Sequence, residues 1–271
     1  VRHRDRVQLE VRPGGHRVTA RVPVAGLELD LDTAVLTGAL TPDARLVVQL
    51  RRGSRTMAET TTRAAGDGTF ALRLLDGGAT GALREGDAIE VVDTAAGGDS
   101  LRLKVPELSI DAEAGALEVS GRAAPGGTLV VLSTGSPGAY VDGALAQAWP
   151  AIGADGRWSA ELVPTTRVAP GLALIGQYQL PSGHVVRRTA FVPLLVVDHG
   201  GARACGVAQP GGAVSARLED GAGTTRASAA GAPDADGRFG LRLADPTGSL
   251  MATRTGDTVR AELAGKPVSL A

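Results

Sequence analysis

Two short motifs recur through this sequence at a constant interval, and they leave few folds open. The first is a Val-Pro step after a strand-like stretch, found at Val22-Pro23, Val105-Pro106 and Val192-Pro193. The second is Asp-Gly followed one residue later by an aromatic side chain, found at Asp67–Phe70, Asp155–Trp158 and Asp236–Phe239. Both motifs recur about every 85 residues, a period in the range where internal repetition decides the fold. The sequence therefore predicts tandem modules of one kind.

The motif positions divide the chain into four segments. Residues 1–22 are predicted to be the closing hairpin of an incomplete or strand-exchanged module, and residues 23–105 form repeat 1. Residues 106–192 form repeat 2, which carries an insertion, and residues 193–271 form repeat 3. Each Val-Pro step suits a linker, because proline fixes its own φ and favours an extended residue before it. We expect the modules to be strung out rather than packed into one globule.

Hydrophobic residues alternate with polar ones inside each repeat. In repeat 1, Leu46, Val48 and Leu50 occupy alternate positions, as Phe70 and Leu72 do further on. This period of two indicates half-buried antiparallel strands, and 38 glycines and 15 prolines supply the turns. The predicted fold class is all-β, with three tandem Ig-like antiparallel β-sandwich domains and an N-terminal closing hairpin.

Charge, hydropathy and cysteine content exclude several classes of function. A formal net charge of −1 argues against a basic nucleic-acid-binding surface. No apolar run reaches the roughly 18 to 20 residues that a membrane span needs. The single cysteine, Cys205, excludes an intrachain disulfide and stands in the slot that holds Thr37 and Ser120 in the other repeats. We expect it to be a small buried side chain.

No residue pattern indicates catalysis. The four histidines are dispersed, with His16 and His184 at equivalent hairpin turns, and no nucleophile elbow, phosphate loop or zinc-protease motif is present. Two acidic pairs, Asp30 with Asp32 and Asp234 with Asp236, suggest calcium, but acidic loops of this kind are more often solvated. The sequence predicts no enzyme activity, no cofactor and no metal.

The aromatic residues gather in repeat 2. Trp158 stands where the other repeats have Phe70 and Phe239, which predicts a core position. Tyr140 and Trp149 lie in the insertion, where aromatic faces suit a contact with glycan or with another subunit. The alternative, which the sequence favours, is that both enlarge the core of a larger domain.

The N-terminal hairpin is a candidate for strand exchange. Its apolar residues alternate with polar ones, and the expected exchange positions are Val7, Leu9, Val11, Val18, Ala20 and Val22. The segment carries a net charge of about +4, against about −5 for the rest of the chain. One hypothesis is that the hairpin adds to, or replaces, the closing strands of repeat 3 in a second copy, building an open fibre. The other is a longer repeat protein cut within a module.

These motifs resemble those of the bacterial Ig-like repeats of large secreted and surface-attached proteins. The resemblance is carried by Gly86-Asp87, Val105–Leu108, Val119–Gly121 and Asp155–Trp158. It implies an extracellular setting, in which such repeats serve as spacers, adhesin stalks, filament subunits or enzyme-appended modules. We expect a non-enzymatic structural protein, a subunit of a surface filament, sheath or adhesin stalk, and the N-terminal hairpin makes self-association into a homopolymer, or binding to other surface proteins, the expected partnership. A second resemblance, to β-sandwich modules of bacterial cell-wall glycosyltransferases, implies the alternative of a carbohydrate-binding or enzyme-appended module with cell-wall glycan as its partner.

Overall fold

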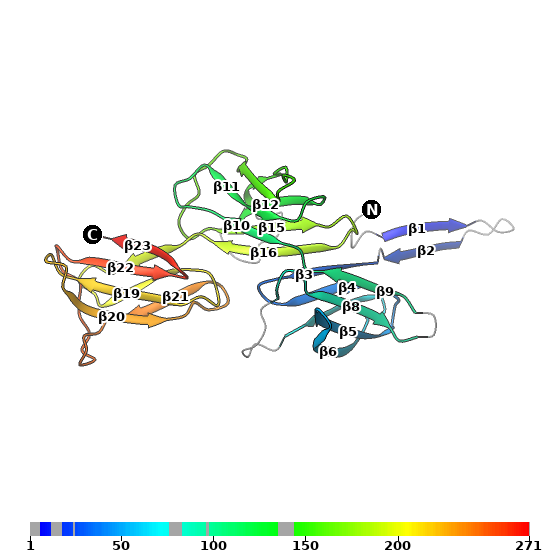
Figure 1. Ribbon diagram of the computed structural model, residues 1–271, viewed down its shortest axis with the longest axis horizontal. Coiled ribbons are helices and arrows are strands. Elements are labelled where there is room, and N and C mark those ends of the chain that lie inside the picture. The colour runs from blue at the N-terminus through cyan, green and yellow to red at the C-terminus, as the bar shows by residue number, and fades with distance from the viewer. Residues whose placement is uncertain are drawn as a thin grey trace.

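The computed structural model describes residues 6–11, 18–23, 25–75, 83–95, 98–134 and 144–270. Within these ranges every regular element is a β-strand, and nearly all neighbouring strands pair antiparallel (Figure 1). The chain is therefore an all-β protein of Ig-like sandwiches, as the sequence predicts.

Repeat 1 is a sandwich of three strands against four. Its strands are β3 (Gly26–Asp30), β4 (Val35–Ala39), β5 (Arg45–Arg52), β6 (Arg55–Arg63), β7 (Thr69–Arg73), β8 (Ala88–Asp93) and β9 (Ser100–Lys104). The order β3-β4-β7 makes one layer and β6-β5-β8-β9 the other. The first, second and fifth strands thus face the remaining four.

Repeats 2 and 3 have the same arrangement. The strands of repeat 2 are β10 (Leu108–Asp111), β11 (Glu118–Ala123), β12 (Thr128–Thr134), β13 (Ala144–Ala148), β14 (Arg157–Glu161), β15 (Ala173–Gln179) and β16 (Val185–Phe191). Those of repeat 3 are β17 (Leu194–Val197), β18 (Arg203–Val207), β19 (Val214–Glu219), β20 (Thr225–Gly231), β21 (Arg238–Arg242), β22 (Thr258–Leu263) and β23 (Lys266–Leu270). The three-stranded layers are β10-β11-β14 and β17-β18-β21.

The N-terminal segment forms a separate two-stranded sheet. Strands β1 (Arg6–Val11) and β2 (Val18–Pro23) pair antiparallel, with Leu9 opposite Ala20. In Figure 1 this hairpin extends from one end of the molecule, and repeat 3 lies at the other end.

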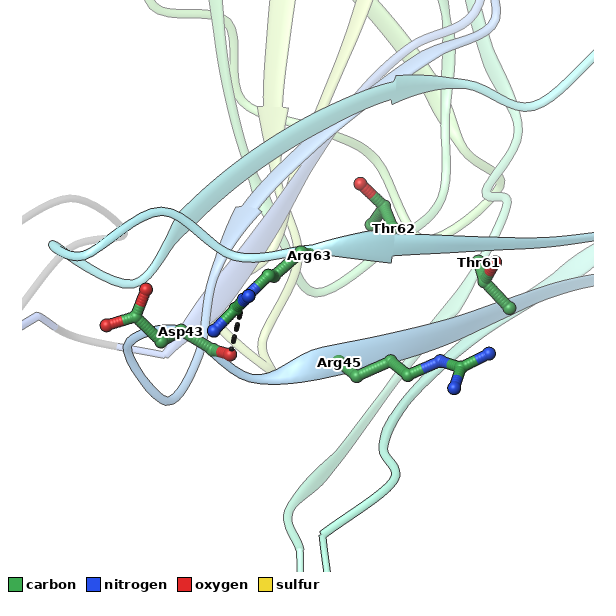
Figure 2. A pocket seen from close by; sticks show the side chains of 5 residues that line it. All are labelled: Asp43, Arg45, Thr61, Thr62 and Arg63. Atoms are coloured by element: carbon green, nitrogen blue, oxygen red, sulfur yellow. Dashed lines mark hydrogen bonds between the residues drawn. The ribbon is translucent and has the colours of Figure 1, made fainter.

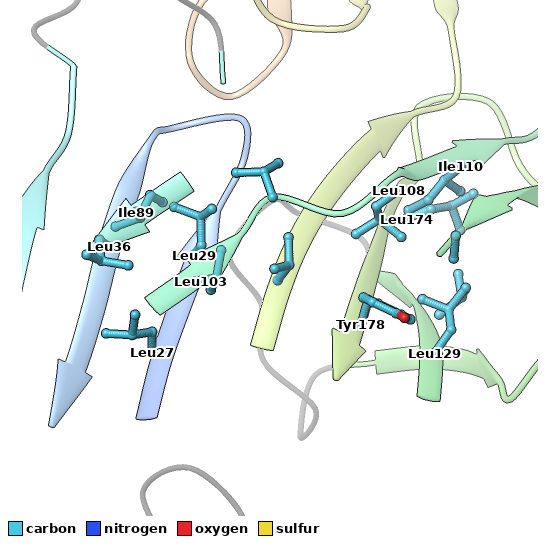
Figure 3. Packing of buried hydrophobic residues seen from close by; sticks show 14 of the residues in the cluster. Leu27, Leu29, Leu36, Ile89, Leu103, Leu108, Ile110, Leu129, Leu174 and Tyr178 are labelled. Carbon is cyan, nitrogen blue, oxygen red and sulfur yellow. The ribbon is translucent and has the colours of Figure 1, made fainter. Parts of the chain in front are cut away.

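The alternation of apolar residues places one face of each strand in the core. Leu46, Val48 and Leu50 of β5 are almost fully buried, while the intervening residues are half-buried. Figure 3 shows the packed side chains of repeat 1, such as Leu29, and those of repeat 2, such as Tyr178. Burial of this apolar surface is the main stabilising contribution to each sandwich.

The two sequence motifs meet across strands. The Gly of the Thr-Gly, Ser-Gly or Cys-Gly step stands directly opposite the aromatic residue of the Asp-Gly motif in every repeat. The three pairs are Gly38 with Phe70, Gly121 with Trp158, and Gly206 with Phe239. The aromatic side chains are buried, and Trp158 therefore occupies the core as predicted. A glycine lets the ring lie over the backbone, because a Cβ at Gly38 would come within 2.5 Å of Phe70 Cζ.

Repeats 1 and 2 are not strung out, contrary to the expectation from the Val-Pro linkers. The four-stranded layer of repeat 2 and the three-stranded layer of repeat 1 join in one seven-stranded sheet, in the order β13-β12-β15-β16-β3-β4-β7. Their buried residues form one cluster, whereas repeat 3 has its own. An extended linker sets the direction in which the chain leaves a repeat, but it does not set how far the next repeat is displaced sideways. The strand edges of neighbouring repeats can therefore still pair.

Candidate functional site

The most developed contact surface is the junction between β16 and β3, which we call the seam. The strands run parallel, with Val185 opposite Glu28 and Arg187 opposite Asp30. The amide of Leu31 continues the ladder by donating to the Arg187 carbonyl at 3.0 Å. The last strand of repeat 2 is thereby added to the first strand of repeat 1.

Charged side chains make contacts across the seam. Arg187 Nε lies 2.9 Å from Glu28 Oε1, and both side chains are mostly buried. Arg188 donates to the Leu108 carbonyl at 2.7 Å and lies 3.9 Å from Asp32. Because these pairs are partly removed from water, they are screened by salt less than exposed pairs are.

Asp32 is held in the seam by the backbone of repeat 2. Its carboxylate accepts a hydrogen bond from the Thr189 amide, and its side chain is only 20% exposed. Burial raises the pKa of Asp32 to about 6, against the lowering effect of the Thr189 amide. Folding therefore opposes the ionisation of this group.

His184 joins the two repeats at the other end of the seam. Its Nδ1 accepts a hydrogen bond from the Leu27 amide at 3.3 Å, and the residue is buried. Burial lowers the pKa of His184, because the charged form loses hydration. The hairpin turn thus brings the imidazole of His184 to the backbone of repeat 1.

Repeat 3 meets repeat 2 through a different set of contacts. The Gln209 side chain accepts from the Phe191 amide at 3.2 Å and donates to the Thr189 carbonyl at 3.1 Å. The Phe191 ring lies against Gly237, where a Cβ would come within 2.9 Å of the ring. Here a side chain binds the end of β16, and no strand pairing joins the sheets of these two repeats within the described residues.

The candidate aromatic site is represented by Trp149, since Tyr140 lies outside the described residues. Trp149 follows β13 directly and is 59% exposed. Leu145 and Val163 are exposed nearby, and Val163 is held against β13 by backbone hydrogen bonds with Gln147 of 2.9 and 2.7 Å. The core placement that the sequence favours is therefore wrong for Trp149, because its strand is the last of the seven-stranded sheet and its outer face is open.

The six candidate strand-exchange residues lie on β1 and β2. Their register pairs Val7 with Val22, Leu9 with Ala20, and Val11 with Val18. Within the described residues, the hairpin pairs with no other sheet.

Cys205 does not have the buried environment that the sequence predicts. It lies on β18 opposite Val196 and Gly240 and is half-buried. Its equivalents in repeats 1 and 2, Thr37 and Ser120, are half-buried and exposed. This position faces outward, because the glycine that follows it takes the inward place below the aromatic ring.

The first aspartate of each acidic pair binds the backbone of its own loop. Asp30 accepts hydrogen bonds from the Asp32 and Thr33 amides at 3.0 and 2.9 Å. Asp234 accepts from the Asp236 and Arg238 amides in the same way. Over the described ranges, no three His, Cys, Asp or Glu residues gather as a metal site would require. The same ranges contain no helix long and apolar enough to cross a membrane.

A recurrent Arg–Asp pair anchors the turn before the sixth strand. In repeat 1, Arg52 binds Asp87 through two hydrogen bonds of 2.8 Å, and the Arg84 amide donates to the same carboxylate at 2.9 Å. Repeat 3 has the equivalent pair Arg226 and Asp257. The guanidinium of Arg52 lowers the pKa of Asp87. These carboxylates hold turns in place.

One open groove lies at the ends of β5 and β6 (Figure 2). It measures about 490 Å³ and is lined by Asp43, Arg45, Thr61, Thr62 and Arg63. Arg63 Nε donates to the Asp43 carbonyl at 3.1 Å, while Figure 2 shows Arg45 pointing away from that contact. The groove presents cationic and hydroxyl groups on a solvated surface, without an arrangement that polarises a substrate.

The seam and the joint to repeat 3 define a class of tandem β-sandwich protein whose neighbouring modules are held together by direct contacts.

No protein-family model and no curated protein matches the sequence. A solved tetra-tandem repeat from the extending region of a large adhesion protein is 20% identical, with 91% of this chain and 73% of that chain covered and a TM-score of 0.22.

Two further solved structures show the same level of similarity. A 1.5-MDa bacterial ice-binding adhesin is 17% identical, with 91% of this chain and 95% of that chain covered and a TM-score of 0.22. A Salmonella alpha-2-macroglobulin reacted with methylamine is 11% identical, with 97% of this chain and 24% of that chain covered and a TM-score of 0.23. TM-scores this low carry no argument about function.

Proposed function

We propose that the chain is a non-enzymatic structural subunit of a bacterial surface filament, sheath or adhesin stalk, which self-associates by β-strand addition. The observation that carries this proposal is the seam, in which the last strand of one repeat extends a sheet of its neighbour. Main-chain hydrogen bonds of this kind join modules without a specialised pocket. The extracellular setting rests on the sequence resemblance to secreted and surface-attached repeats.

The roles of the polar side chains support a structural function. Asp87 fixes a turn, His184 accepts from the Leu27 amide across the seam, and Gln209 binds the end of β16. These groups are engaged in holding strands and repeats together. Each of them hydrogen-bonds to backbone groups of the protein itself.

The experiment that tests this function compares the full chain with a variant lacking residues 1–22. Negative-stain microscopy and sedimentation velocity of the full chain are expected to show concentration-dependent, end-to-end assemblies. The deletion should leave single particles, because the N-terminal hairpin provides the strands that are added. An unchanged state of association after the deletion would contradict the proposal.

A second candidate function, glycan binding, is favoured by the exposure of Trp149 beside Leu145 and Val163. An exposed indole face suits stacking on a sugar ring. If this surface binds glycan, Trp149→Ala should abolish retention on cell-wall polysaccharide while the melting temperature stays unchanged. Leu250→Ala, at another exposed aliphatic position in repeat 3, is the matched control and should be retained. Equal retention of Trp149→Ala and the native chain would exclude this function.

A further inference from the structure

Strand β17 has an edge of unusual composition. Its four residues, Leu194 to Val197, are all aliphatic, and it is the one strand in the described part of the chain without a polar, charged, glycine or proline residue. It ends the three-stranded layer of repeat 3, and Val196 is 45% exposed. Terminal strands offer unpaired N–H and C=O groups and are commonly protected by charge or proline. β17 lacks that protection.

The equivalent strand in repeat 1 shows what such an edge accepts. β3 and β17 are each the first strand of a repeat, and each pairs with the glycine of the second strand, Leu27 with Gly38 and Leu195 with Gly206. The other edge of β3 is covered by β16 in the seam. Consequently Glu28 is only 9% exposed, whereas Val196 at the equivalent position is 45% exposed.

A groove beside β17 has room for the side chains of an added strand. It measures about 420 Å³, and Val197, Val259 and Leu270 are among the residues that line it. Leu270 is 41% exposed there. An extended segment on the β17 edge would therefore bury apolar surface in addition to forming main-chain hydrogen bonds.

The neighbouring terminal strand of repeat 3 is a poorer acceptor. β23 begins with Lys266 and Pro267, and proline has no amide to donate to a ladder. A lysine at a strand edge also opposes pairing. This disfavours the closing strands of repeat 3, β22 and β23, as the binding site of the hairpin.

We propose that the free edge of β17 binds strand β2 of a second copy, in the parallel arrangement that β16 has on β3. β2 ends in Val22-Pro23, as β16 is followed by Val192-Pro193, so it is the last strand of a repeat by sequence. The hairpin and repeat 3 lie at opposite ends of the molecule (Figure 1). Each copy thus has one donor and one acceptor, and the contact propagates as an open fibre. This inference rests on the proposed self-association and names its acceptor.

Charge at position 196 provides the test. In the seam, Glu28 at the equivalent position pairs with an arginine of the added strand. β2 contains Arg21 and follows Arg17. Val196→Lys should therefore weaken self-association at least about tenfold in sedimentation velocity, which corresponds to about 1.4 kcal/mol. Val196→Glu should preserve or strengthen it. Leu145→Lys, at an exposed aliphatic residue of terminal strand β13, is the matched control and should have no effect.

Hydrogen exchange of the native chain gives a readout that requires no variant. Amides of β17 should become more protected as protein concentration rises, while those of β23 should not. The acceptor is wrong if deletion of residues 1–22 abolishes association but Val196→Lys leaves it intact, or if protection rises on β23 instead. The proposed function would survive that result. A native chain that stays monomeric at all concentrations would overturn both.

Discussion

Replacement of Gly38 by alanine tests the cross-strand contact between the two sequence motifs. Gly38 on β4 faces Phe70 on β7, and an added Cβ would lie 2.5 Å from Phe70 Cζ and 2.7 Å from Cε1. Gly38 is not among the glycines with positive φ, so alanine suits its backbone. The steric conflict with the ring is therefore the dominant effect of Gly38→Ala.

The expected magnitude follows from two opposing contributions. Without a clash, Gly→Ala stabilises by about 0.4–1 kcal/mol, because the unfolded chain loses freedom. Overpacking a core costs about 1–3 kcal/mol. We expect Gly38→Ala to lower the free energy of unfolding by about 1–2 kcal/mol. Phe70→Leu alone leaves a partial cavity and should cost about 1–2 kcal/mol, less than truncation to alanine.

The double variant separates this explanation from general disruption of the core. Leucine in place of Phe70 removes the two ring atoms nearest to the new methyl group, and the Gly26 carbonyl oxygen, at 3.0 Å, then needs to shift only slightly. Gly38→Ala with Phe70→Leu should therefore be more stable than the two single effects predict, by about 1–2 kcal/mol. The measurement is urea unfolding of all four chains, followed by far-UV circular dichroism. Additivity within about 0.5 kcal/mol would refute the steric argument.

The equivalent pair in repeat 2 is a matched control without rescue. A Cβ on Gly121 would lie 2.1 Å from the backbone oxygen of Ser109 as well as 2.7 Å from Trp158 Cζ2. Trimming the indole does not move that backbone oxygen. Trp158→Leu should therefore fail to restore stability to Gly121→Ala.

Three further perturbations probe the seam and the turns. Both tryptophans lie in repeat 2, so tryptophan fluorescence reports the unfolding of that repeat. Leu46→Ala in repeat 1 should cost about 2–5 kcal/mol, and it should lower the fluorescence midpoint because repeats 1 and 2 share one sheet and one core. Leu241→Ala in repeat 3, which has a separate core, should leave that midpoint unchanged. Asp87→Asn should cost about 2–3 kcal/mol at pH 7. Arg52 lowers the pKa of Asp87, so the stabilisation by the Asp87 carboxylate is present above the unfolded-state pKa of about 3.9 and is lost as pH falls through the folded-state pKa. Urea unfolding across acidic pH should therefore show the stabilities of the variant and native chains converging. Asp32 has a folded pKa of about 6, so its stabilising effect is present below about pH 3.9 and lost as pH rises through 6. Asp32→Asn should therefore raise the free energy of unfolding by about 1–2 kcal/mol at pH 7.5 and by less at pH 4.5; an equal effect at both would contradict the burial argument.

The sequence predicts what happens within a repeat, because alternation and turn residues act locally. Leu46, Val48 and Leu50 are buried as their spacing indicates, and Trp158 is a core residue because it replaces Phe70 of repeat 1. The contact between the two motifs could not be predicted from the sequence. Nothing in the spacing shows that each glycine lies beneath the aromatic residue more than thirty positions later.

Contacts between repeats could not be predicted from these local patterns. The seam depends on which strand edges are left open after each sandwich forms, and His184 is buried only because β3 lies beside its turn. A signal was nevertheless present: acidic Glu28 and Asp32 on one strand region match Arg187 and Arg188 on the other. Trp149 was misplaced for a related reason, since an apolar residue after a terminal strand has no layer above it.

The parallel direction of β3 and β16 determines how repeats 1 and 2 would respond to tension along the chain. The chain enters repeat 1 at the N-terminal end of β3 and leaves repeat 2 at the C-terminal end of β16. Tension along the chain therefore pulls two adjacent strands from opposite ends, and the evenly spaced hydrogen bonds between them are sheared together rather than opened in sequence. Repeats 1 and 2 should resist extension as one unit. The joint at Gln209 and Phe191, which has no ladder to shear, should yield at lower force.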